Sequence, residues 1–431
     1  MTGDGTREIR VDYIARVEGE GALTLRYREG QIEDVELRIF EPPRFFEAFL
    51  PGRSCLEAPD LTARICGICP VAYQMSACRA VEDALGVVVT PEIAALRRLL
   101  YCGEWIESHV LHMVMLHAPD FVGVPDVTAL ARLHGAEVRD ALRVKKTGNA
   151  IVALLGGREI HPINVRIGGF HKLPPREAFA TLADDLEACR PAMERLVRWA
   201  ATFTFPDYTT DVPLVALVGD HYPFLGDTIA TTVGERFDVH DVEGHLVEEH
   251  VAHTTALQAR LVGHGTYLTG PLARWNLNFG VLPPHLRALA TEIGIAAPMR
   301  NPYKLILVRG IEVLYALDEA IHIARTTRVD GPPCVEVKLR AGTGFGATEA
   351  PRGLLWHRYD VDAEGAITAA RIVPPTSQNQ AAIEHDLRSL APAWVDLDDA
   401  TTAARAEHAI RNHDPCISCA THFLTVRREF A

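Results

Sequence analysis

The chain has 431 residues, of which 48% are hydrophobic and 23% charged, and a formal net charge of −13. This composition is typical of a globular protein and argues against a disordered or fibrous chain, while the acidic charge argues against a nucleic-acid binder, which needs clustered lysine and arginine. No apolar run is long enough to span a bilayer, and the N-terminus lacks the pattern of a secretory signal, so we expect a cytoplasmic protein.

The hydrophobic pattern divides the chain into a short β region, a long helical region and a mixed C-terminal part. Residues 8–40 alternate apolar and polar side chains between glycine turns, which predicts a small antiparallel sheet. Helical periodicity then predicts long helices over residues 91–119, 127–155, 174–203 (interrupted at Pro191), 241–263 and 302–328. Strand patterns return over residues 334–342 and in a hairpin over 354–375 that turns at 362–365, and a last helix spans 379–412.

These elements predict a mainly α fold of the α+β class. A bundle of long helices forms its core, and small antiparallel β pieces come from both ends of the chain. No internal repeat or low-complexity linker divides the sequence, so we expect a single domain over residues 1–431.

Two of the sequence's cysteine patterns carry chemical information. Of nine cysteines, four form C-x-x-C pairs, Cys66 with Cys69 and Cys416 with Cys419. A C-x-x-C turn directs both thiolates at one ion, and four thiolates select zinc, nickel or iron. The paired motifs of a structural zinc site usually lie about 15–20 residues apart, whereas these lie 350 residues apart. Spacing alone leaves structural zinc and a functional metal both open.

Seven motifs, in order along the chain, resemble the large, catalytic subunit of the [NiFe] hydrogenases. They are RVEG (16–19), FFEAFLPGR (45–53), RICGIC (64–69), GPLARWN (270–276), EAPRG (349–353), VPPTSQN (373–379) and DPCISCATH (414–422). Within this family, the chain most resembles the cytosolic group-3 enzymes, in the residues after its first cysteine pair and in its compact length. Among the group-3 enzymes it most resembles the NADP-linked branch, also called sulfhydrogenases. This resemblance implies heterolytic oxidation of hydrogen and reduction of protons.

The resemblance implies a nickel–iron centre held by the four thiolates. Cys66 and Cys416 are expected as terminal nickel ligands, and Cys69 and Cys419 as bridges to an iron that carries carbon monoxide and two cyanide ligands. Thiolate-rich ligation fits such soft metals.

The same resemblance assigns three residues to catalysis. Glu18 matches a proton-relay glutamate beside the terminal thiolate, although a solvated strand glutamate is the commoner role for such a residue. Arg352 matches an arginine held over the metals, and Asp414 is placed to orient it through a bidentate pair.

The resemblance also implies contacts to the cyanides and a second metal ion. Val373, Pro374, Pro375 and Thr376 match the stretch that packs around the cyanides. Glu47 and His422 match the side-chain ligands of a magnesium ion.

Three positions depart from the family pattern. Tyr73 and Glu20 stand where many relatives have histidine, and Ser108 stands where respiratory members have an acidic residue. Separately, histidines recur along two predicted helices, at 109, 112 and 117 and at 245, 250 and 253. Such spacing can build a metal site, but hydrogen-bonded core histidines are commoner.

The electron acceptor must lie on other chains. The remaining five cysteines are scattered and cannot hold an iron–sulfur cluster, and no nucleotide-binding fingerprint is visible. The resemblance implies an iron–sulfur small subunit and diaphorase-type subunits that carry further clusters, flavin and NADP(H). It also implies a maturation endopeptidase that removes residues 423–431 after His422.

Several alternatives remain open at this point. An NAD-linked or deazaflavin-linked group-3 hydrogenase would carry the same motifs. A quinone-pocket subunit of respiratory complexes shares the fold but lacks the four cysteines, and a non-catalytic, zinc-clamped relative would be distinguished by its metal content.

Overall fold

A computed structural model describes residues 6–42 and 44–421. The helices are α1 (Phe46–Phe49), α2 (Ala58–Thr62), α3 (Pro70–Leu85), α4 (Pro91–Val110), α5 (Ala118–Val122), α6 (Val127–Leu133), α7 (Gly135–Gly156), α8 (Arg176–Ala200), α9 (Val242–His245), α10 (Pro271–Asn278), α11 (Pro284–Glu292), α12 (Leu305–Thr326), α13 (Pro375–Leu390) and α14 (Asp399–Asn412). The strands are β1 (Thr6–Val11), β2 (Gly21–Arg28), β3 (Gln31–Ile39), β4 (Val165–Arg166), β5 (Gly169–Phe170), β6 (Val215–Val218), β7 (Leu225–Gly226), β8 (Thr228–Thr231), β9 (Arg236–Asp238), β10 (Leu246–His250), β11 (Leu257–Leu261), β12 (Gly342–Ala350), β13 (Gly353–Val361) and β14 (Ile367–Val373).

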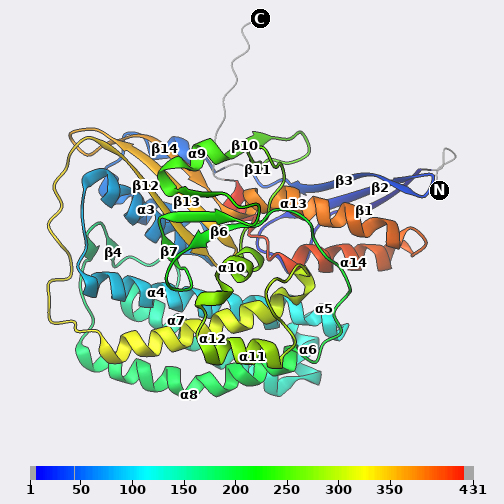
Figure 1. The fold of residues 1–431 in the computed structure, drawn as a ribbon, viewed down its shortest axis with the longest axis horizontal. Helices are drawn as coiled ribbons and strands as arrows, with labels where there is room; N and C mark the ends of the chain where they lie inside the picture. The colour runs from blue at the N-terminus through cyan, green and yellow to red at the C-terminus, as the bar shows by residue number, and fades with distance from the viewer. Residues whose placement is uncertain (1–5, 43, 422–431) are drawn as a thin grey trace, which may run out of the picture.

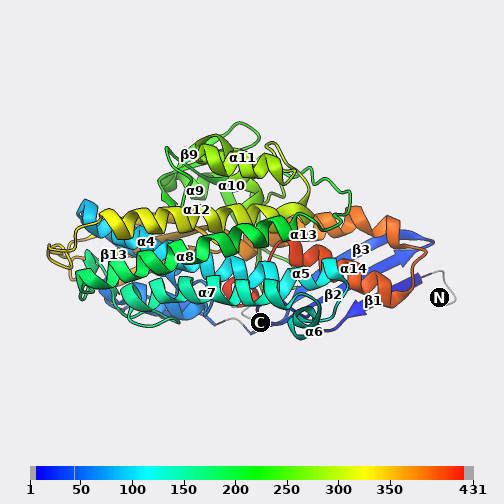
Figure 2. The same ribbon diagram turned by 90° about the horizontal axis from the view of Figure 1, so that it is seen from below.

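Four long helices, α4, α7, α8 and α12, form the bundle that the sequence predicts (Figures 1 and 2). The hydroxyl of Thr90 caps α4 by accepting from the Ile93 amide. Helices α4 and α7 approach closely at Gly103 and Gly148, because a Cβ on Gly103 would lie 3.0 Å from the Gly148 carbonyl oxygen. The mainly α fold with small antiparallel sheets is confirmed.

Two of the helix boundaries differ from the prediction. The first long helix does not end at Pro119, because α4 continues through a π-helical turn, Leu111–His117, into α5, where the proline occupies the first turn. The second predicted helix is two helices that meet at His134.

Helix α8 shows no interruption at Pro191. This proline is exposed, so the carbonyl that loses its helical partner faces solvent, where water can satisfy it.

Two further predictions in this part of the chain are wrong. Residues 241–263 are not a long helix, because β10 and β11 form an antiparallel hairpin there. The apolar residues of β11 recur at every second position, which is the strand period. Residues 334–341 are irregular, and β12 begins only at Gly342.

The last predicted helix is also two elements. Helix α13 starts earlier, at Pro375, and a 3-10 turn, Ala391–Trp394, separates it from α14. The side chain of Asp398 caps α14.

The antiparallel sheet β14-β13-β12-β7 supports the first cysteine pair. Helix α3, which begins directly after Cys69, packs on β12 through two glycines. A Cβ on Gly344 would lie 2.1 Å from the Ala80 carbonyl oxygen, and one on Gly346 would lie 2.6 Å from the Ala80 amide nitrogen. The glycine-rich strand therefore permits a close helix approach and fixes where α3 and its preceding cysteines lie.

The two chain ends lie side by side. Strands β1–β3 form a sheet that packs against α13 and α14, with Leu25 and Ile410 in the shared core (Figure 1). The loop after β1 pairs with the segment after α14 through a parallel bridge between Glu18 and Cys416. This packing carries the second cysteine pair to the first. Within the described residues, no helix is long and apolar enough to cross a membrane.

Candidate metal centre

The four cysteines of the two C-x-x-C motifs converge on one buried point. Their sulfur atoms lie within 4.8 Å of one another. The Sγ atoms of Cys66 and Cys416 are 3.4 Å apart, and those of Cys69 and Cys419 are 3.6 Å apart. Within the second pair, the Sγ atoms of Cys416 and Cys419 are 2.9 Å apart. Each side chain is buried, so four sulfur donors face one small space, as a soft metal centre requires.

The thiols differ strongly in acidity. Burial disfavours a thiolate at Cys66, but hydrogen bonds from the other three thiols, together with the positive charge of Arg352, hold the pKa of Cys66 well below its ordinary value. Burial and the hydrogen bond to Cys419 raise the pKa of Cys416 well above its ordinary value. Without a cation the cluster therefore retains protons, and metal binding would release them.

Glu18 lies against the second cysteine pair. Its Oε2 atom accepts from Cys416 Sγ at 3.0 Å and from the Ser418 amide at 3.1 Å. Its main-chain carbonyl accepts from the Ile417 amide at 2.9 Å. The carboxylate is thus fixed within hydrogen-bonding distance of a thiol.

Arg352 and Asp414 form a buried pair beside the thiols. Arg352 donates from Nη2 to Asp414 Oδ1 at 3.1 Å and from Nε to the Asp414 carbonyl oxygen at 2.8 Å. Although burial disfavours its charge, Asp414 and the cysteine sulfurs raise the pKa of Arg352. Ser108, one of the positions that depart from the family pattern, accepts from Arg352 Nη1 at 3.5 Å. The predicted pairing is therefore present, but one of its two bonds reaches the main chain of Asp414.

Thr376 contacts the site directly, through an Oγ1 that accepts from the Cys416 amide at 3.0 Å. Val373, Pro374 and Pro375 form the buried link between β14 and α13. Glu47 lies on α1, where its Oε1 accepts from the Ile372 amide at 2.6 Å. Its predicted partner His422 lies outside the described residues.

Two residues near the centre carry no signal in the sequence motifs. Arg44 donates from Nη2 to the carbonyl oxygens of Ile65 and Ser418, and so joins the two cysteine segments. Glu104 on α4 is fully buried and accepts from the amides of Val71 and Ala72 at the start of α3. Both contacts depend on segments distant in sequence, which no local pattern reveals.

The histidines of α4 and its continuation are core residues. His112 and His117 are buried and hydrogen-bonded through Nε2 to the Arg411 carbonyl oxygen and to Asn412 Oδ1. His245 ends α9, and the residues at 250 and 253 lie in or after β10, not on a shared helix. Among the described residues, only the four cysteines form a group suited to a metal ion.

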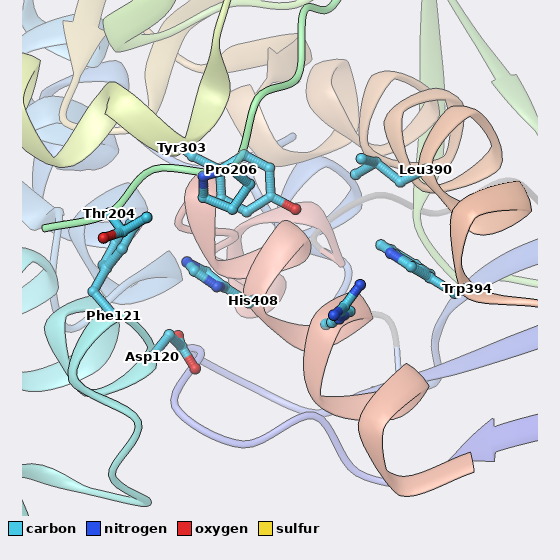
Figure 3. A pocket seen from close by; sticks show the side chains of 9 residues that line it. Asp120, Phe121, Thr204, Pro206, Tyr303, Leu390, Trp394 and His408 are labelled. Carbon is cyan, nitrogen blue, oxygen red and sulfur yellow. The ribbon is translucent and has the colours of Figure 1, made fainter. Parts of the chain in front are cut away.

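A separate cavity of about 400 Å³ opens beside α14 (Figure 3). Its wall includes the side chains of Phe121, Tyr303, Trp394 and His408, and none of the four cysteines lines it. The cavity is thus distinct from the thiol cluster, which is enclosed.

Comparison with known proteins shows the family to which the chain belongs. A family model described as nickel-dependent hydrogenase matches residues 44–138. The sulfhydrogenase 1 subunit alpha of Pyrococcus furiosus is 32% identical over 96% of this chain and 97% of its own length. The chain belongs to the nickel-dependent hydrogenase family. It is a large subunit of the group-3 type, as its sequence motifs predict.

Other relatives extend this likeness. The NAD-reducing hydrogenase HoxS subunit beta of Cupriavidus necator is 27% identical over 97% of this hydrogenase subunit and 95% of its own length. A solved NAD+-reducing [NiFe]-hydrogenase superposes with a TM-score of 0.87 at 27% identity, covering 96% of this chain and 99% of that one. The shared architecture therefore extends over nearly the whole subunit.

Proposed function

We propose that this hydrogenase subunit catalyses reversible hydrogen oxidation in the cytoplasm and exchanges electrons with NADP(H) through partner subunits. The observation that carries the proposal is the buried group of four sulfur atoms, contacted by Glu18 and lying beside Arg352. The NADP link rests on similarity to the sulfhydrogenase alpha subunits, two of which are 32% and 33% identical to this chain.

The sulfur donors fit a nickel–iron centre. Four converging thiols are the donor set that soft metals prefer, and no other described residues form such a group. The thiolates of Cys66, Cys69, Cys416 and Cys419 would hold the nickel and an iron bearing carbon monoxide and two cyanides. Such a centre supplies heterolytic cleavage of hydrogen when bound.

The chain's own residues would handle the proton and the charge. Glu18 Oε2, 3.0 Å from Cys416 Sγ, is placed to take a proton from that sulfur. Arg352, oriented by Asp414, places a fixed positive charge beside the thiolates, where it offsets their negative charge. Thr376 fixes the Cys416 main chain. Together with Val373, Pro374 and Pro375 it would surround the cyanides.

Further parts of the proposal concern maturation and assembly. Glu47 and His422 would hold a magnesium ion, and a maturation endopeptidase would remove residues 423–431 from the single large-subunit domain. Electrons would leave through an iron–sulfur small subunit to flavin-containing, diaphorase-type subunits. The relatives' names, subunit alpha and subunit beta, agree with a multi-subunit enzyme.

NAD as the acceptor is a second candidate, because the NAD-reducing enzymes match nearly the whole chain. The two are separated by assaying the complex, purified with its native partners, for hydrogen-dependent reduction of NADP, NAD and deazaflavin. NADP should be reduced with the highest kcat/KM, and a preference for either other acceptor would refute the NADP assignment.

Infrared spectroscopy of the same complex tests the centre itself. We expect one carbon monoxide and two cyanide stretches, with stoichiometric nickel. Mature protein that lacks these bands and contains zinc instead would refute the proposed function. Mass spectrometry of the active subunit would show whether it ends at His422.

A further inference from the structure

Arg352 occupies the two-residue turn at the tip of the β12–β13 hairpin. In the β12–β13 register, Ala350 pairs with Gly353, so Pro351 and Arg352 alone form the turn. The two turn residues lie beyond the last pair of the β12–β13 ladder, so the main-chain groups around them are held by contacts from other elements.

The carbonyl groups at this tip are held by buried side chains from other elements. Trp105 Nε1 donates to the Glu349 carbonyl oxygen at 2.9 Å. Arg274, on α10, donates to the carbonyl oxygens of Ala350 and Pro351, each at 3.0 Å. Asn379 Nδ2 donates to the carbonyl oxygen of Arg352 at 3.3 Å. Arg274 thus holds the two carbonyls that directly precede Arg352.

Arg274 is itself fixed by a complete set of bonds. Its Nε and Nη2 atoms donate to the two carboxylate oxygens of Glu312 at 2.8 and 2.9 Å, and its Nη1 donates to Glu349 Oε2 at 3.0 Å. With the two carbonyls, these bonds use all five N–H donors of the guanidinium. The side chains of Arg274, Glu312 and Glu349 are fully buried, where unpaired charges would be strongly disfavoured.

Glu312 connects this group to the long-helix bundle. It lies on α12 and also accepts from Tyr222 Oη at 2.8 Å. The residue before α10 also lies close to the hairpin tip, because a Cβ on Gly270 would lie 2.5 Å from the Arg352 carbonyl oxygen. The hairpin tip is thereby tied to α12 of the long-helix bundle.

We propose that Arg274 and Glu312 are positioning residues that hold the Arg352 guanidinium in register with the four-thiol centre. The inference rests on the proposed function, because the consequence of a misplaced Arg352 is slower hydrogen chemistry. Neither residue contacts a cysteine sulfur among the described hydrogen bonds and ion pairs. Their effect therefore passes through Pro351 and Arg352.

The test uses the whole complex, matured with its partners, carrying Arg274→Lys or Glu312→Gln. Lysine keeps the charge but cannot form the fork that spans a carboxylate and two carbonyls. Arg198→Lys is the matched control, because Arg198 lies on the surface, paired with Glu292 and Glu194. Arg352→Lys is the reference variant, because it removes the guanidinium itself. Its cyanide stretches show how the infrared spectrum changes when that group is no longer in place.

We expect Arg274→Lys to keep its nickel and iron content within twofold and to lower kcat for hydrogen oxidation at least tenfold. The KM for hydrogen should change less than twofold, and the cyanide stretches should shift in the direction seen for Arg352→Lys. Glu312→Gln should show the same changes more weakly, and the Arg198→Lys control none of them.

Wild-type stretches and turnover in Arg274→Lys and Glu312→Gln would overturn the inference. Loss of metal from both variants, but not from Arg352→Lys, would also overturn it, because the group would then serve folding alone. Failure of the proposed function is a separate result, recognised by the absence of carbon monoxide and cyanide bands from the wild-type complex.

Discussion

Replacing Asp120 with asparagine should measurably destabilise the subunit. Asp120 accepts from Arg16 Nη2 at 2.6 Å and from Nε and Nη2 of Arg411, each at 2.8 Å. Only 8% of its side chain is exposed. Asp120 therefore connects α5, on which it lies, both to α14 and to the loop before β2.

The size of the effect follows from the pKa of this carboxyl. Burial works against the charged form, but bonds to Arg411 and Arg16 lower the pKa from 3.8 to about 2. At about 1.4 kcal/mol per pKa unit, the carboxylate contributes roughly 2–3 kcal/mol. A chain of 431 residues unfolds with an entropy of roughly 0.9 kcal/mol/K. Asp120→Asn should therefore lower Tm by roughly 3 °C at pH 7.

Thermal unfolding of the purified complex measures this shift. Asp184→Asn is the control, because Asp184 is 70% exposed in its pair with Arg325 and should change the stability little. A folded-state pKa below the unfolded value means that the contribution is complete above about pH 4 and is lost as the pH falls towards 2. A Tm within 0.5 °C of wild type for Asp120→Asn would refute the reasoning.

Three further changes have defined outcomes. Cys69→Ser should abolish nickel binding. Cys334→Ser should retain it, because Cys334 is a partly exposed cysteine outside the cluster. Metal analysis that finds nickel in both variants would contradict the ligand assignment. Glu18→Gln should keep the metals but slow hydrogen–deuterium exchange at least tenfold. The control is Glu20→Gln, at a neighbouring exposed residue. Equal exchange rates in the two variants would exclude Glu18 as the proton acceptor. Gly344→Ala should destabilise the fold, since its Cβ would overlap the α3 backbone, and an unchanged Tm would argue against this packing.

The parts of the fold that the sequence predicts are those with a local signal. The long helices and the two C-x-x-C turns follow from spacing within a few residues, and the conclusion that the chain ends meet follows from the distance between the cysteine pairs. The sequence of the β10–β11 hairpin predicts a helix, because charged residues between its apolar positions also fit a helical period.

The network around Arg352 could not be found in the same way. Glu312 lies on α12, outside every motif, and although Arg274 and Glu349 stand in the motifs at 270–276 and 349–353, nothing in those motifs indicates that the three side chains pair. Their burial follows from the way these elements pack, which a single sequence does not state. Arg352 and Glu18, by contrast, have roles that the resemblance to a known family itself implies.

The meeting of the two cysteine pairs also has a mechanical consequence. A metal held by Cys66 and Cys416 would cross-link the chain across 350 residues. If such a link acts like a disulfide, it lowers the conformational entropy of the unfolded chain. For a loop of this length, the loss would stabilise the folded subunit by about 6 kcal/mol at 25 °C. Because the second pair follows the last helix, the ribosome must finish nearly the whole subunit before the link can form.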